Sequence, residues 1–328
     1  MQSFKALRIH QEGGKIVSRM ETIGLEDLSP GEVVVKVRYS TINYKDALAA
    51  TGAGKILRRY PLVGGIDLSG EVVSSSDPSV TPGQKVVITG CGLSETHDGG
   101  YAEYARVKAE WVTPIPDGLD EFQCMALGTA GFTAALAIHR IEQNGQQPQN
   151  GEVVVTGASG GVGSLATDML AGRGYQVVAV SGKRSAEEYL KGLGAARVLM
   201  RDEISLGTRP LEEAQWAGAI DNVGGELLAW LTRTTKFWGN IASVGMAAGI
   251  DVQTTVLPFI LRGVSLLGVN SVYVSRELRL EVWRRLAGDL KPRHLGRIAS
   301  RTIDFDQLPG AFDDYLKAGV IGRTVVRF

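Results

Sequence analysis

The sequence predicts an α/β protein in which an all-β module is followed by a doubly wound parallel sheet. Three observations support this prediction. Short β-branched runs separated by turns fill residues 1–125, and strands alternate with helical patterns beyond them. A glycine-rich turn in residues 157–163 joins a valine-rich strand to a helix. A chain of 328 residues is too long for a single compact hydrophobic core and is long enough for two domains.

Three runs in the first module have the composition of strands. Residues 31–43, 69–75 and 81–90 are rich in β-branched side chains, and turn sequences such as LSPGE precede them. From residue 122 to residue 141 the pattern becomes helical, with small residues that allow close packing. We therefore expect a barrel-like β module that ends where this helix begins.

The chain ends in FDDYLKAGVIGRTVVRF, residues 312–328, which predicts a helix and a short strand. The simplest partner for that strand is the β module at the start of the chain. The first domain is therefore expected to be discontinuous, with residues 1–125 completed by 271–328.

The second domain is expected over residues 126–270, where strands and helices alternate. Such alternation is typical of a doubly wound parallel sheet. The six strand candidates are residues 152–157, 175–182, 195–201, 217–224, 239–245 and 265–271.

Charge and composition limit the class of protein. Lys plus Arg and Asp plus Glu number 35 each, so the net charge gives no indication of nucleic acid or of an anionic membrane surface. We find no apolar run long enough to span a bilayer and no apolar core of a signal peptide in residues 1–15. Cys91 and Cys124 are the only cysteines, which fits a reducing compartment. A soluble, cytoplasmic enzyme is expected.

The turn after the strand EVVVT carries a dinucleotide-binding pattern. Counted back from Gly163, the pattern falls on Ala158, Gly160 and Gly163, with Ala158 in place of the first glycine. Gly160 lets the backbone approach a pyrophosphate, and Gly163 lets the helix lie close to the strand. The helix N-terminus then offers its N–H groups to the phosphates. The alternative is a glycine-rich turn of another α/β protein. The expected contacts are Ser159, Gly160, Gly161 and Val162.

The end of the second strand indicates which dinucleotide is bound. An NAD site would place Asp or Glu there to bind the ribose hydroxyl groups. This chain has Ser181, Gly182 and Lys183 instead, and Arg201 follows the third strand. A hydroxyl group and cations bind a 2′-phosphate that a carboxylate would repel. NADPH is therefore expected, although these cations could instead be ordinary solvated surface charges.

Over its whole length the chain resembles the medium-chain dehydrogenases/reductases, in their zinc-free, quinone-oxidoreductase-like branch. It is most similar to the NADPH-dependent acrylyl-CoA reductases, which reduce the C=C bond of a CoA thioester. The resemblance implies a GroES-like β-barrel domain beside a six-stranded nucleotide domain, an active site in the cleft between them, and a homodimer. The motifs that carry it are NYKDALAATG, GIDLSGEVV, GGYAEYARV, GTAGFTAALAI, VVVTGASGGVGS, AIDNVGG and GRTVV.

Many relatives hold zinc, which polarises a substrate oxygen. Their ligand motifs correspond here to Asn43-Tyr44-Lys45-Asp46 and Gly65-Ile66-Asp67, and their four-cysteine lobe is absent. Cys91 and His97 are too few for a four-ligand site. No metal is therefore expected. The remaining histidines, His10, His139 and His294, are scattered.

Without a metal, hydrogen bonds must activate the substrate. The resemblance implies that hydride passes from the nicotinamide to the β-carbon of the thioester, so that donors are needed near the enolate oxygen. Tyr44 is the first candidate, because the resemblance implies that it touches the nicotinamide end of the cofactor and its phenol could donate a hydrogen bond. Asn43 and Asp46 are candidates for orienting substrate or relaying a proton, but they could also only end a strand and cap a helix.

Five further residues are expected near the cofactor. By resemblance Thr129 faces the nicotinamide, although it could only cap a helix. Gly245, Met246 and Asn270 follow strands at the carboxyl edge of the sheet, where ligands collect. Arg323 is expected near the cleft, but a salt bridge would explain it equally well.

Coenzyme A needs cations for its own phosphates. Lys55, Arg58 and Arg59, in GKILRRYP, could supply them or could be a solvated loop. An acyl-CoA substrate is the first expectation. A quinone or enone reductase on the same scaffold is an alternative, because fold and cofactor do not determine substrate. A non-catalytic NADPH-binding protein is another; an RNA-binding form would use the basic segment 277–297, but the neutral charge disfavours nucleic acid.

Overall fold

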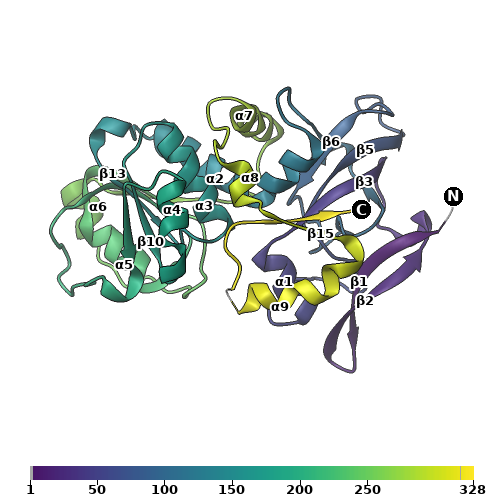
Figure 1. The fold of residues 1–328 in the computed structure, drawn as a ribbon, viewed down its shortest axis with the longest axis horizontal. Coiled ribbons are helices and arrows are strands. Elements are labelled where there is room, and N and C mark those ends of the chain that lie inside the picture. Colours follow the sequence, from purple (N-terminus) through teal and green to yellow (C-terminus); the bar gives the residue numbers. More distant parts are fainter. Residues whose placement is uncertain (1–2, 318) are drawn as a thin grey trace. The chain divides into compact units, whose positions relative to one another are not determined.

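Figure 1 shows the computed structural model of the chain, which describes residues 3–317 and 319–328. The chain divides into two compact units. Unit 1 comprises residues 1–129, 272–287 and 295–328, and unit 2 comprises residues 130–271 and 288–294. The expected domain limits at residues 125 and 270 stay a prediction. The fold class, a β-rich unit followed by an α/β unit, is confirmed.

Unit 1 contains two sheets. A small sheet has the order β2-β1-β4, and a seven-stranded sheet has the order β15-β16-β3-β5-β6-β8, with β7 paired to β3. The three strands predicted from β-branched runs are present as β3, β5 and β6. The bounds are β1 Phe4–Glu12, β2 Lys15–Ile23, β3 Val33–Ile42, β4 Leu62–Val63, β5 Asp67–Ser75, β6 Lys85–Thr89, β7 Tyr104–Val107, β8 Thr113–Pro114, β15 Arg301–Asp304 and β16 Thr324–Arg327.

The N-terminal hairpin of β1 and β2 was not predicted. Its strands carry charged residues such as Arg8, Glu12 and Arg19 among the apolar ones, so their β pattern is weak in the sequence. The turn between them is Gly13-Gly14, and both glycines have positive φ (55° and 80°), which tight hairpin turns require. The sequence signal for this hairpin therefore lay in its turn.

The C-terminal strand pairs with the N-terminal part of the chain, as the sequence predicted. Strand β16 runs antiparallel to β3, with Thr324 opposite Ile42 and Arg327 opposite Tyr39. The pairing ties the last residues of the chain into the sheet that the first hundred residues build. The helices of unit 1 are α1 Tyr44–Thr51, the start of α2 Glu121–Gln143, α7 Arg276–Ala287, α8 Leu295–Ile298 and α9 Phe312–Leu316.

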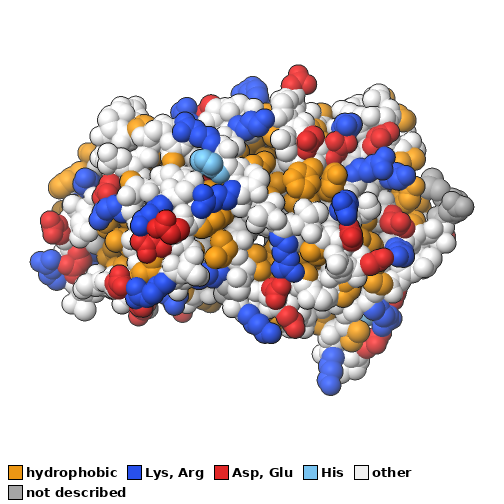
Figure 2. Space-filling view, in the orientation of Figure 1, with side chains coloured by type: hydrophobic (Ala, Val, Ile, Leu, Met, Phe, Trp, Pro, Cys, Tyr) orange, Lys and Arg blue, Asp and Glu red, His pale blue; other side chains and the backbone are white. Residues whose placement is uncertain are grey.

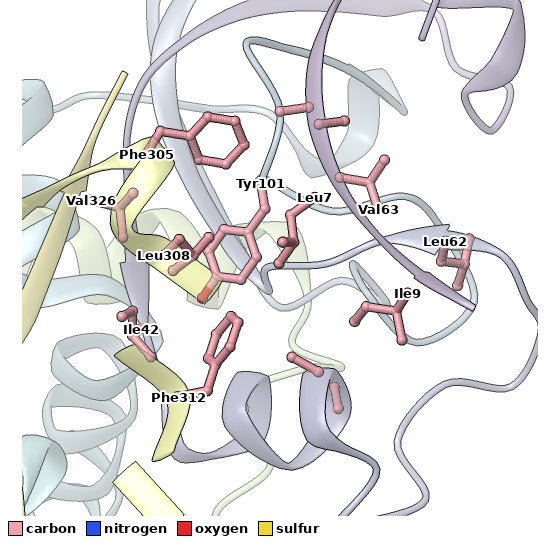
Figure 3. Close-up of a cluster of buried hydrophobic side chains, with 14 of the residues drawn as sticks. Leu7, Ile9, Ile42, Leu62, Val63, Tyr101, Phe305, Leu308, Phe312 and Val326 are labelled. Carbon is pink, nitrogen blue, oxygen red and sulfur yellow. The ribbon is translucent and has the colours of Figure 1, made fainter. Parts of the chain in front are cut away.

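One apolar cluster of unit 1 joins distant parts of the sequence. Figure 3 shows the ring of Tyr101 among Leu7 of β1, Leu308 of the 3-10 helix Phe305–Ala311 and Phe312, the first residue of α9. Tyr101 is 1% exposed and donates a hydrogen bond from its hydroxyl to the Thr41 carbonyl at 3.0 Å. The phenol is buried without loss of its hydrogen bond, so the cluster holds β1, β3 and the C-terminal segment together.

Unit 2 is built on one six-stranded parallel sheet, in agreement with the prediction. The strand order is β11-β10-β9-β12-β13-β14, with the first strand of the unit, β9, in the middle. All four residues of β9 are buried, because helices cover both faces of such a sheet. The strands are β9 Val153–Thr156, β10 Val177–Ser181, β11 Arg197–Met200, β12 Trp216–Asp221, β13 Thr235–Ser243 and β14 Ser265–Gly268.

Helices α3, α4, α5 and α6 connect successive strands of this sheet, whereas β11 and β12 are joined by a segment with only a short 3-10 turn, Arg201–Glu203. Such crossover connections allow neighbouring strands to run parallel. A core cluster on one face of the sheet includes Val154, Val178, Trp216, Leu231 and Ile241. The apolar side chains come from four strands and a helix, so this face of the sheet is closed to water. The helices of unit 2 are α3 Gly161–Gly172, α4 Glu187–Gly192, α5 Gly225–Thr234 and α6 Leu257–Arg262, together with the remainder of α2.

Helix α2 corrects one inference from the sequence. The helix has 23 residues and is long and apolar enough to cross a membrane. The sequence pattern, in contrast, indicated no apolar run of that length. However, 89% of its apolar stretch lies buried within the protein, as in the core helix of a soluble protein. Small residues and short polar residues interrupt the apolar ones, so the sequence pattern does not reveal how apolar the helix is. Its helical geometry breaks at Gly128, where φ is 52° and ψ is −157°.

Charged side chains of both signs are interspersed on the surface. Figure 2 shows Lys and Arg among Asp and Glu over the displayed face, without a large field of one sign. This distribution agrees with the zero net charge of the sequence. The displayed face therefore offers no broad basic surface of the kind that nucleic acid requires.

The cluster around Tyr101 predicts the effect of a mutation in the C-terminal segment. Phe312 is 2% exposed and its ring centroid lies 6.1 Å from that of Tyr101. We expect Phe312→Ala to lower the free energy of unfolding by about 3–5 kcal/mol, because it leaves a cavity in a packed core. Urea denaturation followed by circular dichroism measures the change.

Phe237→Ala is the control, because it removes the same side chain from a position that is 67% exposed. Its effect should stay within about 0.5 kcal/mol. Equal effects of the two substitutions would contradict the role of the Tyr101 cluster.

Candidate functional site

The centre of the candidate site in unit 1 is the carboxylate of Asp67, the first residue of β5. Asp67 is 0% exposed. Its Oδ2 accepts hydrogen bonds from the Thr129 N–H at 2.9 Å and from the Asn43 side-chain Nδ2 at 2.8 Å, and its Oδ1 accepts one from the Thr129 hydroxyl. Asp67 therefore joins the residue before α1 to the kink of α2.

Asn43 and Asp46 hold the start of helix α1. The Oδ2 of Asp46 accepts hydrogen bonds from the backbone N–H of Asn43 at 2.8 Å and from its Nδ2 at 3.0 Å. The Ile66 N–H donates to Asp46 Oδ1 at 3.0 Å. A carboxyl group in the first turn satisfies N–H groups that a helix leaves unpaired.

These bonds place the predicted catalytic residues in different surroundings. Asn43 is 8% exposed and Asp46 is 1% exposed, and both are engaged by neighbours. Tyr44, the first residue of α1, is 50% exposed. Of the three, only Tyr44 presents its side chain to solvent. Roles in catalysis for all three stay predictions.

Arg323 completes the buried network. Its Nη1 donates to Asn43 Oδ1 at 2.9 Å, its Nη2 to the Thr41 hydroxyl oxygen at 2.8 Å and its Nε to the Ala126 carbonyl at 3.3 Å. The side chain is 3% exposed. These bonds give Arg323 a structural role in unit 1, and a contact with the cofactor stays a prediction.

Gly128 permits the chain to pass over this network. A Cβ atom at Gly128 would lie 2.5 Å from Arg323 Nη2 and 2.8 Å from Asp67 Oδ2. Its φ of 52° lies in the left-handed region that favours glycine. The next residue, Thr129, can therefore direct its N–H and hydroxyl at Asp67. This placement explains why the motif GTAGFTA starts with glycine.

Burial raises the pKa of the two carboxyl groups. Burial, followed by the nearby charge of Asp67, raises the pKa of Asp46 from 3.8 to about 7. Burial also raises the pKa of Asp67, while hydrogen bonds from Thr129, the charge of Arg323 and a bond from Asn43 lower it. Asp46 lacks the stabilisation by Arg323, so we assign the proton of the pair to Asp46 near neutral pH.

The candidate site in unit 2 begins at the turn between β9 and α3. Gly157 has a φ of 57°, and a Cβ at Gly163 would lie 2.3 Å from the Gly157 carbonyl oxygen. Only glycine fits at Gly163, as the sequence pattern predicted. At Gly160 the nearest atom to such a Cβ is 3.4 Å away, which leaves room for a ligand to approach.

Helix α3 begins immediately after Gly160. The N–H groups of its first residues, Gly161 and Val162 among them, have no partner within the helix, and they lie at the positive end of the helix dipole. Ser159, 6% exposed, precedes them. This arrangement can bind a diphosphate, as predicted for Ser159, Gly160, Gly161 and Val162.

A second polar group lies at the ends of β10 and β11. The Ser181 hydroxyl lies 3.3 Å from the Ser159 hydroxyl and accepts a hydrogen bond from the Lys183 N–H at 3.0 Å. A Cβ at Gly182 would lie 3.8 Å from the guanidinium carbon of Arg201, so Arg201 covers Gly182. The structure thus brings together Ser159, Ser181, Gly182, Lys183 and Arg201.

The cations at this position differ in their surroundings. Arg184 forms ion pairs with Asp202 at 3.1 Å and Glu203 at 2.8 Å. Arg201 forms no ion pair with any residue that the structure describes. Partial burial lowers the pKa of Lys183. Two donors with no acidic residue at the end of β10 suit a phosphate on the ribose rather than free hydroxyl groups.

The other predicted cofactor residues lie at the ends of later strands. Gly245 follows β13, and a Cβ there would lie 2.3 Å from the Asn222 carbonyl oxygen. Met246 is 69% exposed. Asn270 follows β14 and is exposed. They share the carboxyl edge of the sheet with the glycine turn, and their contact with a cofactor stays a prediction.

Asp67 is the residue that the sequence reading did not assign to the site. It lies in Gly65-Ile66-Asp67, the counterpart of a zinc-ligand motif, and that motif predicts the absence of a zinc ligand but no role for Asp67. The signal available was a carboxyl group inside an apolar strand, since a buried Asp is rare without hydrogen-bond partners.

Two family models match parts of the chain. Residues 29–117 match the alcohol dehydrogenase GroES-like domain, and residues 161–287 match the family described as zinc-binding dehydrogenase. The chain is 48% identical over 323 residues to the probable acrylyl-CoA reductase AcuI of Escherichia coli, covering 98% of this chain and 99% of the relative. The chain belongs to the medium-chain dehydrogenase/reductase family.

Other relatives in this dehydrogenase/reductase family carry a different name. The chain is 47% identical over 325 residues to the putative quinone oxidoreductase YhfP of Bacillus subtilis, covering 99% of this chain and 98% of the relative. Members of the family are oxidoreductases, and so is this chain. The names of the relatives differ in the substrate they state.

Solved structures of such dehydrogenases/reductases have the same fold. Escherichia coli YhdH with bound NADPH has a TM-score of 0.95 and 48% identity, covering 98% of this chain and 99% of that chain. Bacillus subtilis YhfP with NAD bound has a TM-score of 0.98 and 46% identity over the whole of both chains. Members with this fold have thus been solved with either dinucleotide.

A zinc site does not fit the residues of this dehydrogenase/reductase. Within residues 3–317 and 319–328 no three His, Cys, Asp or Glu side chains are grouped to hold a metal. Both ring nitrogens of His97 lie 3.0 Å from backbone carbonyl oxygens, those of Asp98 and Pro30. Burial raises the pKa of the Cys91 thiol, which disfavours the thiolate that a metal needs. The expected absence of metal stays a prediction.

The raised pKa of Asp46 predicts a pH dependence of stability. Because this pKa is about 7 in the folded chain against 3.8 as its ordinary value, the folded state holds the proton between these values and the unfolded state does not. The contribution of Asp46 is therefore most favourable at low pH and falls as pH rises toward 7. In Asp46→Asn this fall should disappear.

Urea denaturation at pH 5, 6, 7 and 8 measures the difference between wild type and Asp46→Asn. The hydrogen bonds lost in the variant shift its whole curve, so the slope with pH is the informative quantity. Parallel curves would contradict the assignment of the proton to Asp46.

Proposed function

We propose that the chain reduces the C=C bond of acrylyl-CoA, or of a closely related enoyl-CoA, with NADPH to give the saturated thioester. The observation that carries the proposal is the group of Ser181, Lys183 and Arg201 beside the glycine turn of a chain that is 48% identical to a probable acrylyl-CoA reductase.

Residues of unit 2 would hold the cofactor. The first N–H groups of α3 bind its diphosphate, while Ser181, Lys183 and Arg201 bind the 2′-phosphate by charge-assisted hydrogen bonds. When bound, NADPH supplies the hydride that reduces the β-carbon. The relative solved with NADPH supports NADPH as the cofactor. Because another relative was solved with NAD, the quantity to measure is the ratio of the affinities for NADPH and NADH.

Residues of unit 1 would stabilise the charge that develops on the thioester oxygen. Tyr44 is half-exposed and its phenol can donate a hydrogen bond. Asn43 and Asp46 act on the reaction indirectly, since they are buried and hold the first turn of the helix that carries Tyr44. Thr129 is held by Asp67 in a similar way at the kink of α2.

The name of the second relative supports an alternative substrate class. A quinone or enone reductase would use the same cofactor group and the same phenol, with no need for coenzyme A. The non-catalytic NADPH-binding protein is the remaining alternative. A homodimer and a cytoplasmic location stay predictions. Strand β14, at the edge of the six-stranded sheet, is where a second copy could continue it.

The substrate proposal is tested by the rate of NADPH oxidation at 340 nm. We expect turnover with acrylyl-CoA to exceed that with crotonyl-CoA and with a small quinone by at least about tenfold in kcat/KM. In Tyr44→Phe, kcat should fall by about tenfold to a hundredfold, because one donor to the developing charge is lost.

A protein that oxidises NADPH with quinone but not with any thioester would be a general enone reductase. A protein inactive with every substrate would be a binding protein. Either result would reject the proposal.

The cofactor proposal is tested by titration with NADPH and NADH, followed by nucleotide fluorescence. Lys183→Gln combined with Arg201→Gln should weaken NADPH binding by about a hundredfold, since two charge-assisted hydrogen bonds to the phosphate are lost. NADH binding should stay within about threefold of the wild type.

Arg184→Gln is the matched control, because Arg184 is already paired with Asp202 and Glu203. Equal losses of NADPH and NADH affinity in the Lys183/Arg201 variant would contradict a 2′-phosphate site.

A further inference from the structure

Unit 1 contains a hollow that no part of the proposed mechanism uses. Its volume is about 760 Å³, within the range of small-molecule sites. Its lining comes from the β1–β2 hairpin and from the loop that follows α1. Figure 1 labels β1, β2 and α1 within unit 1. The side chains in the lining are Gln11, Ile16, Lys55, Leu57, Arg58 and Tyr60.

Two cations of this hollow are free of ion pairs with the described part of the chain. Neither Lys55 nor Arg58 forms an ion pair with any residue that the structure describes, and both are exposed. The backbone of Arg58 is nevertheless fixed, because its N–H donates to the Glu95 carbonyl at 2.7 Å. Two unpaired cations on a fixed loop are suited to bind an anion.

Arg59, the third cation of this loop, behaves differently. Its Nε donates to the Thr96 carbonyl at 3.0 Å, and its guanidinium also reaches Ser29 and lies 3.9 Å from Asp98. Arg59 therefore holds the loop in place, whereas Lys55 and Arg58 line the hollow. The sequence alone did not distinguish Arg59 from Lys55 and Arg58.

The remaining lining suits a nucleoside. The phenol ring of Tyr60 offers a flat surface, the Gln11 amide can donate and accept hydrogen bonds, and Ile16 and Leu57 provide apolar contact. Gly52, at the end of α1, keeps the hairpin close, since a Cβ there would lie 2.8 Å from Ile16 Cβ. The hollow thus combines positive charge with an aromatic and apolar lining.

The hollow lies one helix length from the candidate catalytic tyrosine. Tyr44 begins α1, and Lys55 and Arg58 follow its last residue, Thr51. A helix of 8 residues is about 12 Å long. A ligand with its phosphates at the hollow and its reacting group at Tyr44 must therefore carry a long, narrow arm. The pantetheine arm of coenzyme A has this character.

We propose that this hollow binds the adenosine phosphate end of the CoA thioester, with Lys55 and Arg58 on the phosphates. The assignment of the thioester as ligand rests on the proposed function. The site would fix the end of the substrate that does not react, so that it contributes to KM rather than to the chemical step.

Kinetics with full and truncated substrates test the proposal. Lys55→Gln combined with Arg58→Gln should lower kcat/KM for acrylyl-CoA by about tenfold through KM, because charge-assisted bonds to phosphate are lost. The acrylyl thioester of N-acetylcysteamine, which lacks phosphates, should react with both proteins equally. Lys36→Gln, an exposed cation of β3 outside the hollow, is the control and should change neither rate.

A binding measurement separates this proposal from the proposed function. Calorimetry with adenosine 3′,5′-bisphosphate is carried out on protein saturated with NADP⁺, so that the cofactor site is filled. The wild type should bind the probe, and the double variant should bind it about tenfold more weakly. Added NaCl should weaken binding to the wild type more than to the variant.

Each combination of results has one meaning. Probe binding that depends on Lys55 and Arg58, without turnover of acrylyl-CoA, supports the hollow and rejects the proposed function. If the double variant turns over acrylyl-CoA as fast as the wild type, the result supports the proposed function and overturns the proposal that the hollow binds the CoA end of the substrate. Failure of the wild type to bind the probe, or equal loss with the truncated thioester, also overturns it.

Discussion

The buried carboxylate of Asp67 is the interaction on which the candidate site of unit 1 depends. It accepts hydrogen bonds from Asn43, which precedes α1, and from Thr129, which follows the break in α2. Arg323, from the end of the chain, supports the same network through Asn43. A buried charge is costly unless hydrogen bonds and an opposite charge satisfy it, so the three segments must meet in this arrangement. Tyr44 takes its position from the helix that this network starts.

In unit 2 the controlling constraint is steric rather than electrostatic. The first turn of α3 approaches the Gly157 carbonyl so closely that no side chain fits at Gly163. This approach directs the N–H groups of the helix start to one point at the edge of the sheet. Ser181 and Arg201 reach the same edge because β9, β10 and β11 are neighbouring parallel strands. The arrangement of the residues proposed to bind the cofactor therefore follows from the strand order and from the close contact between Gly163 and the Gly157 carbonyl.

The sequence predicted features whose cause is local and could not predict those that depend on distant contacts. The six strands of unit 2 and the role of Gly163 follow from valine runs and glycine spacing, which are visible in a short window. The ion pairs of Arg184, which distinguish it from Arg201, depend on how two loops fold together. The role of Asp67 depends on Asn43 and Thr129, which are distant in the sequence. The apolar character of α2 was underestimated because small and polar residues interrupt it, although packing buries it.

The most direct test of the role of Asp67 is a double-mutant cycle between Asp67→Asn and Thr129→Val, with the free energy of unfolding measured in urea. Thr129→Val keeps the shape of the side chain and removes the hydroxyl that donates to Asp67. We expect a coupling of about 1–3 kcal/mol between the two substitutions, as for residues joined by a buried hydrogen bond. Additive effects, with a coupling of zero within error, would show that the Thr129 hydroxyl and the carboxylate of Asp67 do not stabilise each other and would contradict the central place of Asp67 in the site.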